Sequence, residues 1–280
     1  MKYGRTSTFV AFLAVTVLLA SLHATAGTLV VCAPGYPGST AEAQPAMDAF
    51  ARALTAFGPE LSAVYFERED GGVAALKADD SDFAMLTLPF FLEHRVDLGL
   101  KPLAQAIPEG NGSKQSWTLV AAAGRIGAPQ DLEGWKIISI AGHSESFVRS
   151  VVFDGWGPSP KDLDIVFSSR VLTALRKAAK GEKVAVLLDG PQAESINRLP
   201  FGKELEILRT ASELPVSLVC SVGGRLNDAA EKAFTEALFA MGTDEASREA
   251  LAGVRIERFV PVDRRALDGA IEAFERVGPV

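Results

Sequence analysis

Residues 28–33, Thr-Leu-Val-Val-Cys-Ala, decide the fold, because they are apolar almost throughout and lack the alternation of a half-exposed strand. Such a run is typical of a strand buried on both faces of a parallel sheet. Residues 34–38, Pro-Gly-Tyr-Pro-Gly, then predict a turn. The next apolar residues recur at the spacing of one helix face: Met47, Phe50, Ala51, Leu54 and Phe57. A strand, a turn and a helix in this order predict an α/β fold.

The same alternation continues along the chain. Residues 129–135 read as a short capped turn, and a long helix carrying Phe234, Leu238 and Met241 follows Gly223-Gly224. Other helices are expected at 72–78, 145–153, 171–180 and 192–197. Strands are expected at 61–66, 83–88, 102–107, 117–123, 136–140, 164–167, 184–189, 205–209 and 215–222, the last in the chain. The pattern predicts two α/β units, each with a mostly parallel sheet flanked by helices.

The first 26 residues read as an export signal. Lys2 and Arg5 precede an apolar run over 9–22, and Ala24-Thr25-Ala26 has the small-x-small form that signal peptidases cut. The apolar run of about 14 residues is shorter than the roughly 20 that a membrane-spanning helix needs, which disfavours the alternative of an anchor. We therefore expect a cleaved signal peptide and a soluble mature protein that begins at Gly27.

Composition excludes several classes of function. The chain has 28 basic and 35 acidic residues; without Lys2 and Arg5, 26 basic residues remain and the net charge is −9. This acidic balance disfavours nucleic acid and anionic lipid as partners. Cys32 and Cys220 lie in apolar runs, and either a disulfide or two buried thiols fits the sequence. We expect neither a metal, since the histidines and cysteines form no cluster, nor a cofactor.

Three predicted strands end in loops that place hydroxyl, glycine or acidic residues at a helix start. Helix N-termini carry unpaired amides and favour anions, so converging starts predict an anion or carboxylate pocket. Ser39 also fits a capping box with Glu42, and this role alone explains the serine equally well. Ser144 and Ser146 have the same capping alternative, although two serines and a histidine in one turn exceed what a cap needs. The candidate ligand-binding residues in these loops are Ser39, Thr40, His143, Ser144, Ser146, Asp189 and Gln192.

Catalytic patterns are weaker. Residues 142–146, Gly-His-Ser-Glu-Ser, approximate the nucleophile elbow G-x-S-x-G, and Asp189 supplies an acid, but no histidine follows His143. The chain order of that hydrolase triad is therefore impossible. Gly223-Gly224 lacks the third glycine of a dinucleotide-binding loop. The sequence accordingly predicts no catalytic residues and no enzyme.

Two aromatic residues fall where a cleft between the units would open. Tyr36 lies in the first turn, and we expect it to contact ligand. Trp117 offers a flat face and an N–H donor, and it fits either a hinge-packing role or a cleft wall.

Five segments, in this order, carry a resemblance to a known family. They are Glu42-Ala43-Gln44-Pro45, Leu86-Thr87-Leu88-Pro89-Phe90-Phe91, Ser116-Trp117-Thr118-Leu119-Val120, Asp131-Leu132-Glu133-Gly134-Trp135 and Ala185-Val186-Leu187-Leu188-Asp189-Gly190. Over nearly all the mature chain, the sequence resembles the phosphate-, phosphite- and phosphonate-type periplasmic substrate-binding proteins of bacterial ABC importers.

The resemblance implies a two-lobed type II periplasmic binding protein fold, with lobe 1 at 27–119 and 215–280 and lobe 2 at 120–214. It implies a monomeric receptor that holds a small anion, such as a phosphonate, phosphate or related oxyacid, in the cleft and passes it to an inner-membrane permease. By matching position, Thr87 joins the candidate ligand-binding residues. The turn at 142–146 departs from the serine/threonine-rich turn of the phosphonate binders, because Glu145 would repel a dianion if it faced the pocket.

Two alternatives share this fold. A periplasmic sensor or assembly factor that binds a partner protein would show a large apolar surface patch and no enclosed pocket. An enzyme built on the fold would need a competent nucleophile or acid–base pair in the cleft. Fold alone does not choose among the three functions.

Overall fold

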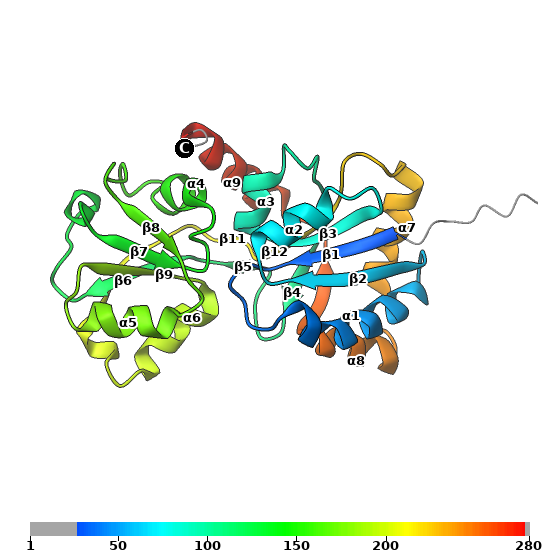
Figure 1. Ribbon diagram of the computed structural model, residues 1–280, viewed down its shortest axis with the longest axis horizontal. Helices are drawn as coiled ribbons and strands as arrows, with labels where there is room; N and C mark the ends of the chain where they lie inside the picture. Colours follow the sequence, from blue (N-terminus) through cyan, green and yellow to red (C-terminus); the bar gives the residue numbers. More distant parts are fainter. Residues whose placement is uncertain (1–26, 278–280) are drawn as a thin grey trace, which may run out of the picture.

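The computed structural model describes residues 27–277, and the predicted signal peptide lies outside them. Two lobes lie side by side, each built on its own sheet (Figure 1). We call the part with the larger sheet lobe 1 and the other lobe 2. The predicted two-lobed α/β architecture is confirmed. No helix within 27–277 is long and apolar enough to cross a membrane.

The sheet of lobe 1 has the strand order β13-β4-β12-β3-β1-β2. Strands β1, β2 and β3 are parallel, so their carboxyl ends meet at the edge that faces lobe 2. Strand β12 runs antiparallel between β3 and β4, and β13 runs antiparallel to β4 at the sheet edge. The strands are β1 (Gly27–Cys32), β2 (Leu61–Phe66), β3 (Ser81–Thr87), β4 (Lys101–Pro108), β12 (Ser217–Ser221) and β13 (Ile256–Val260).

The sheet of lobe 2 has the order β10-β6-β9-β7-β8. Strands β7, β8 and β9 are parallel, while β6 pairs antiparallel with both β9 and β10. A two-stranded ladder of β5 and β11 lies at the crossing between the lobes. The strands are β5 (Lys114–Gln115), β6 (Thr118–Ala122), β7 (Lys136–Ser139), β8 (Asp164–Phe167), β9 (Val184–Leu188), β10 (Leu205–Thr210) and β11 (Leu214–Pro215).

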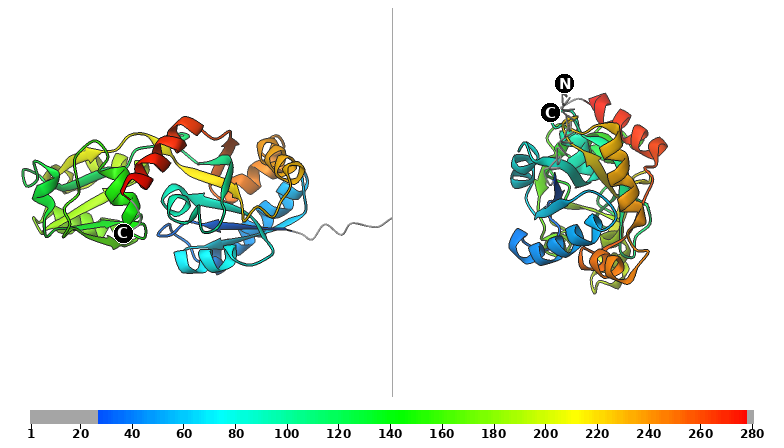
Figure 2. Two further views of the ribbon diagram at one scale, coloured as in Figure 1. Left: turned by 90° about the horizontal axis from the view of Figure 1, so that it is seen from above. Right: turned by 90° about the vertical axis from the view of Figure 1, so that its right-hand side faces the viewer.

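Helices cover both faces of the lobe 1 sheet. One face packs on α1, α7 and α8 around a core that includes Met47, Phe50 and Phe234. The other face packs on α2 and α3, and its core continues into lobe 2. Helix α9 crosses the hinge and contacts lobe 2 (Figure 2). These helices are α1 (Thr40–Thr55), α2 (Glu69–Leu76), α3 (Leu88–His94), α7 (Asp228–Ala240), α8 (Glu245–Gly253) and α9 (Arg264–Val277).

The helices of lobe 2 are short. The predicted helix at 145–153 is one α-helical turn that continues as a π-helical segment, η2. Helix α5 packs its apolar face on β9 and β6. The elements are η1 (Pro129–Leu132), α4 (Glu145–Phe147), η2 (Val148–Val152), α5 (Val171–Ala179), α6 (Gly190–Ser195), η3 (Ile196–Arg198) and η4 (Gly202–Glu204).

Sequence reasoning missed α3, α8, β13 and α9. The strand expected at 215–222 is present as β12, but it is not the last in the chain, because β13 follows it. Strand β13 was not predicted because its middle residues Glu257 and Arg258 are exposed, which is compatible with an edge position but breaks the apolar pattern of a buried strand.

Of the two states that the sequence allowed for the cysteines, the structure shows two buried thiols: Cys32 and Cys220 are both buried and unpaired within the described chain. Strand β3 separates their two strands, so they are about 10 Å apart and beyond disulfide reach.

Candidate functional site

A cavity of about 410 Å³ lies where lobe 1, the hinge and lobe 2 meet. Its walls are the carboxyl ends of β1 and β3, the first turns of α1, the loop before β5, and the start of α6. Three of the predicted site residues line it, Tyr36, Thr87 and Asp189. Other residues that line it include Val31, Glu42, Ala43, Ala46, Met47, Tyr65, Met85, Asn111, Gln115, Val216, Ser217, Val254, Arg255 and Ile256.

Tyr36 and Asp189 join the two lobes across this cavity. The Tyr36 hydroxyl donates to Asp189 Oδ2 at 3.0 Å, and Asp189 Oδ1 accepts from the backbone N–H of Gln192 at 2.9 Å. Asp189 is the N-cap of α6, and its side chain is buried, with 3% of the residue exposed. This burial raises the pKa of Asp189 despite the two hydrogen bonds. Gln192 lies behind the cap, where its Oε1 accepts from the Asp189 N–H at 3.3 Å.

Two residues that line the cavity carry a buried hydroxyl with no hydrogen-bond partner within residues 27–277: Thr87, through Oγ1, and Tyr65, through Oη. Both oxygen atoms are buried, and burial raises the pKa of Tyr65 to about 12, so its hydroxyl stays protonated and able to donate. A buried hydroxyl without a partner costs free energy, which a ligand with acceptor oxygens would recover. Tyr65 was not among the predicted site residues, because its strand position alone marks it as core.

The start of α1 is occupied by the chain's own carboxylates. The Ser39 hydroxyl accepts from Glu42 N–H at 3.3 Å, and Glu42 Oε2 accepts from the Ser39 backbone N–H at 3.0 Å, which completes a capping box. The Ser39 hydroxyl also donates to Glu42 Oε2 at 2.9 Å. Thr40 donates through its N–H and its hydroxyl to Glu67 Oε2, at 3.0 and 2.9 Å. Neither Ser39 nor Thr40 lines the cavity. Here the structure accounts for both residues by capping.

The turn with His143, Ser144 and Ser146 contacts lobe 1 away from the cavity. Ser144 donates to Glu93 Oε2 at 2.6 Å, and His143 Nδ1 lies 3.8 Å from Glu69 Oε2. Burial lowers the pKa of His143 to about 4, so the imidazole is neutral at pH 7. Ser146 is buried, and its carbonyl accepts from the Ser150 hydroxyl at 2.5 Å. These residues join the lobes at a second place, and Glu93 and Glu69 were not predicted to take part.

Trp117 packs in the hinge. Only 2% of the residue is exposed, and its ring meets Phe147 edge-on with 5.4 Å between centroids. Trp117 Nε1 has no partner among the described atoms, and the residue does not line the cavity. Of the two roles that the sequence allowed, the geometry fits hinge packing.

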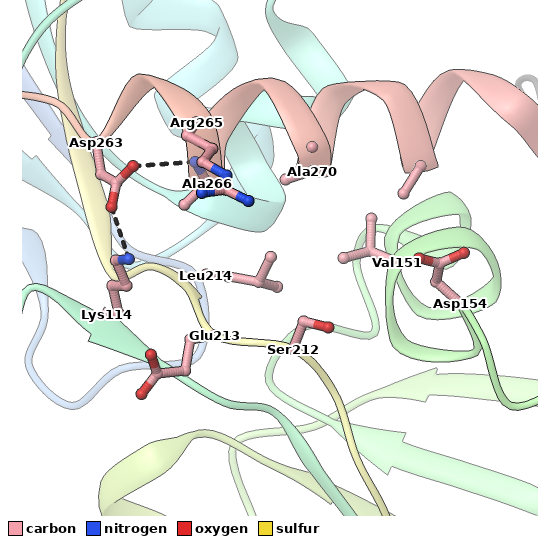
Figure 3. A pocket seen from close by; sticks show the side chains of 12 residues that line it. Lys114, Val151, Asp154, Ser212, Glu213, Leu214, Asp263, Arg265, Ala266 and Ala270 are labelled. Carbon is pink, nitrogen blue, oxygen red and sulfur yellow. Dashed lines mark hydrogen bonds and ion pairs between the residues drawn. The ribbon is translucent and has the colours of Figure 1, made fainter.

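A second cavity, of about 500 Å³, lies beside α9 on the hinge and contains none of the predicted site residues (Figure 3). Leu214, Val151 and Ala270 face it, and its rim carries an ion pair between Lys114 and Asp263 at 2.7 Å. Asp263 also caps α9 by accepting from Ala266 N–H at 3.0 Å. Because this cavity holds no unpartnered buried polar atom among those described, we take the cavity at Tyr36 as the candidate site. No cluster that could hold a metal ion occurs in residues 27–277.

Comparisons with known proteins agree with this layout. A family model described as the periplasmic substrate-binding protein of a phosphonate ABC transporter matches residues 36–267. No curated protein sequence matches the chain.

Among solved structures, XAC2383 from Xanthomonas citri bound to ATP is similar with a TM-score of 0.70 and 16% identity, covering 90% of this chain and 98% of that one. PhnD1 from Prochlorococcus marinus in complex with methylphosphonate gives a TM-score of 0.63 and 13% identity, covering 90% and 99%. A binding protein component of an ABC phosphonate transporter from Pseudomonas aeruginosa gives 0.61 and 14%, covering 90% and 87%. At these identities the likeness establishes a shared fold.

Proposed function

The chain belongs to the periplasmic substrate-binding protein family of phosphonate ABC transporters, and from this premise we propose that it is the receptor for a small oxyacid bound in the cavity at Tyr36. The family is a substrate-binding component of a transporter rather than an enzyme, so the predictions of family, two-lobed fold and lack of catalysis are confirmed. The family works in the periplasm, and its partner is the permease of the transporter.

The observation that carries the proposal is the unpartnered hydroxyl of Thr87 beside the interlobe hydrogen bond of Tyr36 and Asp189. Thr87 belongs to lobe 1 and Asp189 to lobe 2, so a solute at this point touches both lobes and favours their closed arrangement. Hydroxyl donors suit the acceptor oxygens of a phosphonate, a phosphate or a related oxyacid.

Asp189 sets a condition on the solute. An ionised carboxylate beside an oxyanion is unfavourable, and the raised pKa of Asp189 reduces this cost by favouring the neutral acid. We therefore propose recognition through hydroxyl groups rather than through free helix amides, since the starts of α1 and α6 carry the chain's own caps.

Several further features belong to the same proposal. We propose that residues 1–26 are removed as a signal peptide, that the mature protein is a monomer, and that 27–119 with 215–280 and 120–214 move as two lobes about the hinge ladder β5–β11. The exposed large apolar residues Val96, Phe167, Leu172, Ile207 and Phe239 come from five different segments of the chain, a distribution that favours a solute receptor over a partner-binding sensor.

The test is a thermal-shift screen of the chain from Gly27 onward against phosphate, phosphite, alkylphosphonates, sulfate and small carboxylates. A solute at about 100 times its dissociation constant stabilises the fold by roughly 2.7 kcal/mol. Thr87→Val should weaken binding of the best solute by about 1 to 2 kcal/mol without destabilising the free protein, because it removes a hydroxyl that lacks a partner. Thr87→Ser, which keeps the hydroxyl, is the matched control. The absence of a thermal shift with every oxyacid tested would overturn the proposal.

A further inference from the structure

The lining of the cavity at Tyr36 changes from polar at its outer end to apolar at its inner end, as the strand register shows. Thr87 of β3 lies opposite Ser217 of β12 at the sheet edge that faces lobe 2. Two residues deeper along β3, about 7 Å away, Met85 lies opposite Val31 of β1. Residues two apart on a strand point to the same face, so Thr87 and Met85 line one wall, with the polar end outermost.

The inner end is apolar and still accessible. Val31, Tyr65 and Met85 keep 7%, 8% and 7% of their surface exposed, whereas Val30, which points to the opposite face and does not line the cavity, keeps 0%. Because Val31, Tyr65 and Met85 line the cavity from closely packed strands, their remaining surface faces the cavity rather than bulk water. The cavity therefore continues from the cleft into lobe 1.

Helix α1 and the segment after α8 complete this apolar wall. Ala43, Ala46 and Met47 come from α1, Val254 comes from the link between α8 and β13, and Ile256 is the first residue of β13. The alanines matter because larger side chains at their positions would fill the space between α1 and the sheet. Glu42 and Arg255, the charged residues of this part of the lining, are exposed to solvent.

A small oxyanion that accepts from Thr87 leaves most of this space unused. The whole cavity, at about 410 Å³, falls within the range of roughly 300 to 1,000 Å³ that small-molecule sites occupy. A methyl group would reach little of the apolar wall, whereas a longer substituent would transfer its surface from water to Met85, Val31 and Met47.

We propose that the preferred solute is an oxyacid with an apolar substituent longer than a methyl group, its oxygens at Thr87 and its substituent between α1 and the β1–β3 wall. The inference rests on the proposed function, because it names the class of solute for the same cavity. Tyr65, whose unpartnered hydroxyl lies in the apolar row, gives the inner end one donor for a polar atom on the substituent.

The test is a calorimetric titration of the chain from Gly27 with methyl-, ethyl-, propyl-, butyl- and hexylphosphonate. The expected result is a dissociation constant that falls roughly fourfold for each added methylene until the wall is covered. Ala46→Leu fills the inner end and should flatten this series, so that hexyl- and methylphosphonate bind with similar affinities. Ala43→Leu is a second filling variant, and Ala41→Leu, the same change at an exposed position of α1 outside the cavity, is the control that should keep the slope.

The outcomes separate the two proposals. If methylphosphonate or phosphate binds and longer chains bind no more tightly, the apolar-substituent inference is overturned and the receptor proposal stands. If chain-length dependence persists in both filling variants, the substituent lies elsewhere and the inference is overturned as well. If neither these phosphonates nor any other oxyacid binds, both proposals fail.

Discussion

At the scale of single residues, the site depends on contacts between positions far apart in the chain. Tyr36 and Asp189 are 153 residues apart and share a hydrogen bond of 3.0 Å. Each could be marked from the sequence by its place in a loop after a strand, but their contact could not, because it depends on how the lobes close. The free hydroxyl of Tyr65 was also beyond sequence reasoning, since only the fold shows that its oxygen lacks a partner among the described residues.

Asp189 predicts a pH dependence of solute binding. Its pKa is raised by burial, so as the pH falls below neutral the carboxyl gains its proton earlier than an ordinary aspartate would and repels an anion less. Affinity for an oxyacid of constant charge should therefore rise over this range, and Asp189→Asn should remove the rise while keeping the α6 cap, which asparagine also forms. Titrations at several pH values measure this. A wild-type affinity that falls with acidification would contradict the assignment.

His143 predicts a pH dependence of stability. Its pKa is about 4 in the folded protein and about 6.5 when unfolded, so between these values the unfolded state binds the proton more tightly. Stability should fall as the pH drops from about 6.5 to about 4, by about 3 kcal/mol from this group alone. Glu69 and His94 lie beside it in both proteins, so the informative quantity is the difference from His143→Gln in urea unfolding. Parallel profiles for the two proteins would show that His143 is not the cause.

At the scale of elements, apolar runs and helical spacing predicted β1, β2, β9 and α1 well, because each buries at least one continuous face. Helix α9 was missed although it is strongly amphipathic, because its apolar residues occur singly or in pairs among charged side chains. The sequence also left the role of Ser39 open between a cap and a ligand contact. The capping box in the structure explains Ser39 without a ligand.

This explanation of Ser39 separates stability from binding. Ser39→Ala removes the hydroxyl that accepts from Glu42 N–H, and loss of an N-cap costs about 1 kcal/mol. The variant should therefore unfold at a lower urea concentration and bind the best oxyacid with unchanged affinity once folded. The matched comparison is Thr87→Val, for which affinity should fall while the stability of the free protein stays unchanged. If the fully folded Ser39→Ala variant binds the oxyacid much more weakly than the wild type, Ser39 contacts the ligand and the assignment of Ser39 to capping alone is wrong.

At the scale of the whole molecule, order along the chain was the strongest predictor. Two α/β units follow from pattern, and the family resemblance supplied the crossing strands and the cleft between the units. The closing contacts followed from neither: Tyr36 with Asp189 on one side, and Ser144 with Glu93 on the other, join the lobes without a solute. Whether a polar side chain points into a cavity or onto the chain's own carboxylate is decided by packing, which one sequence does not encode locally.

The most direct test of the receptor account is a crystal structure of the chain with the oxyacid that stabilises it most. The account predicts the acid between the lobes, with an oxygen within hydrogen-bond distance of Thr87 Oγ1 and its substituent against Met85 and Val31. An oxyacid found instead in the groove beside α9, or held only by the turn at His143, would contradict it.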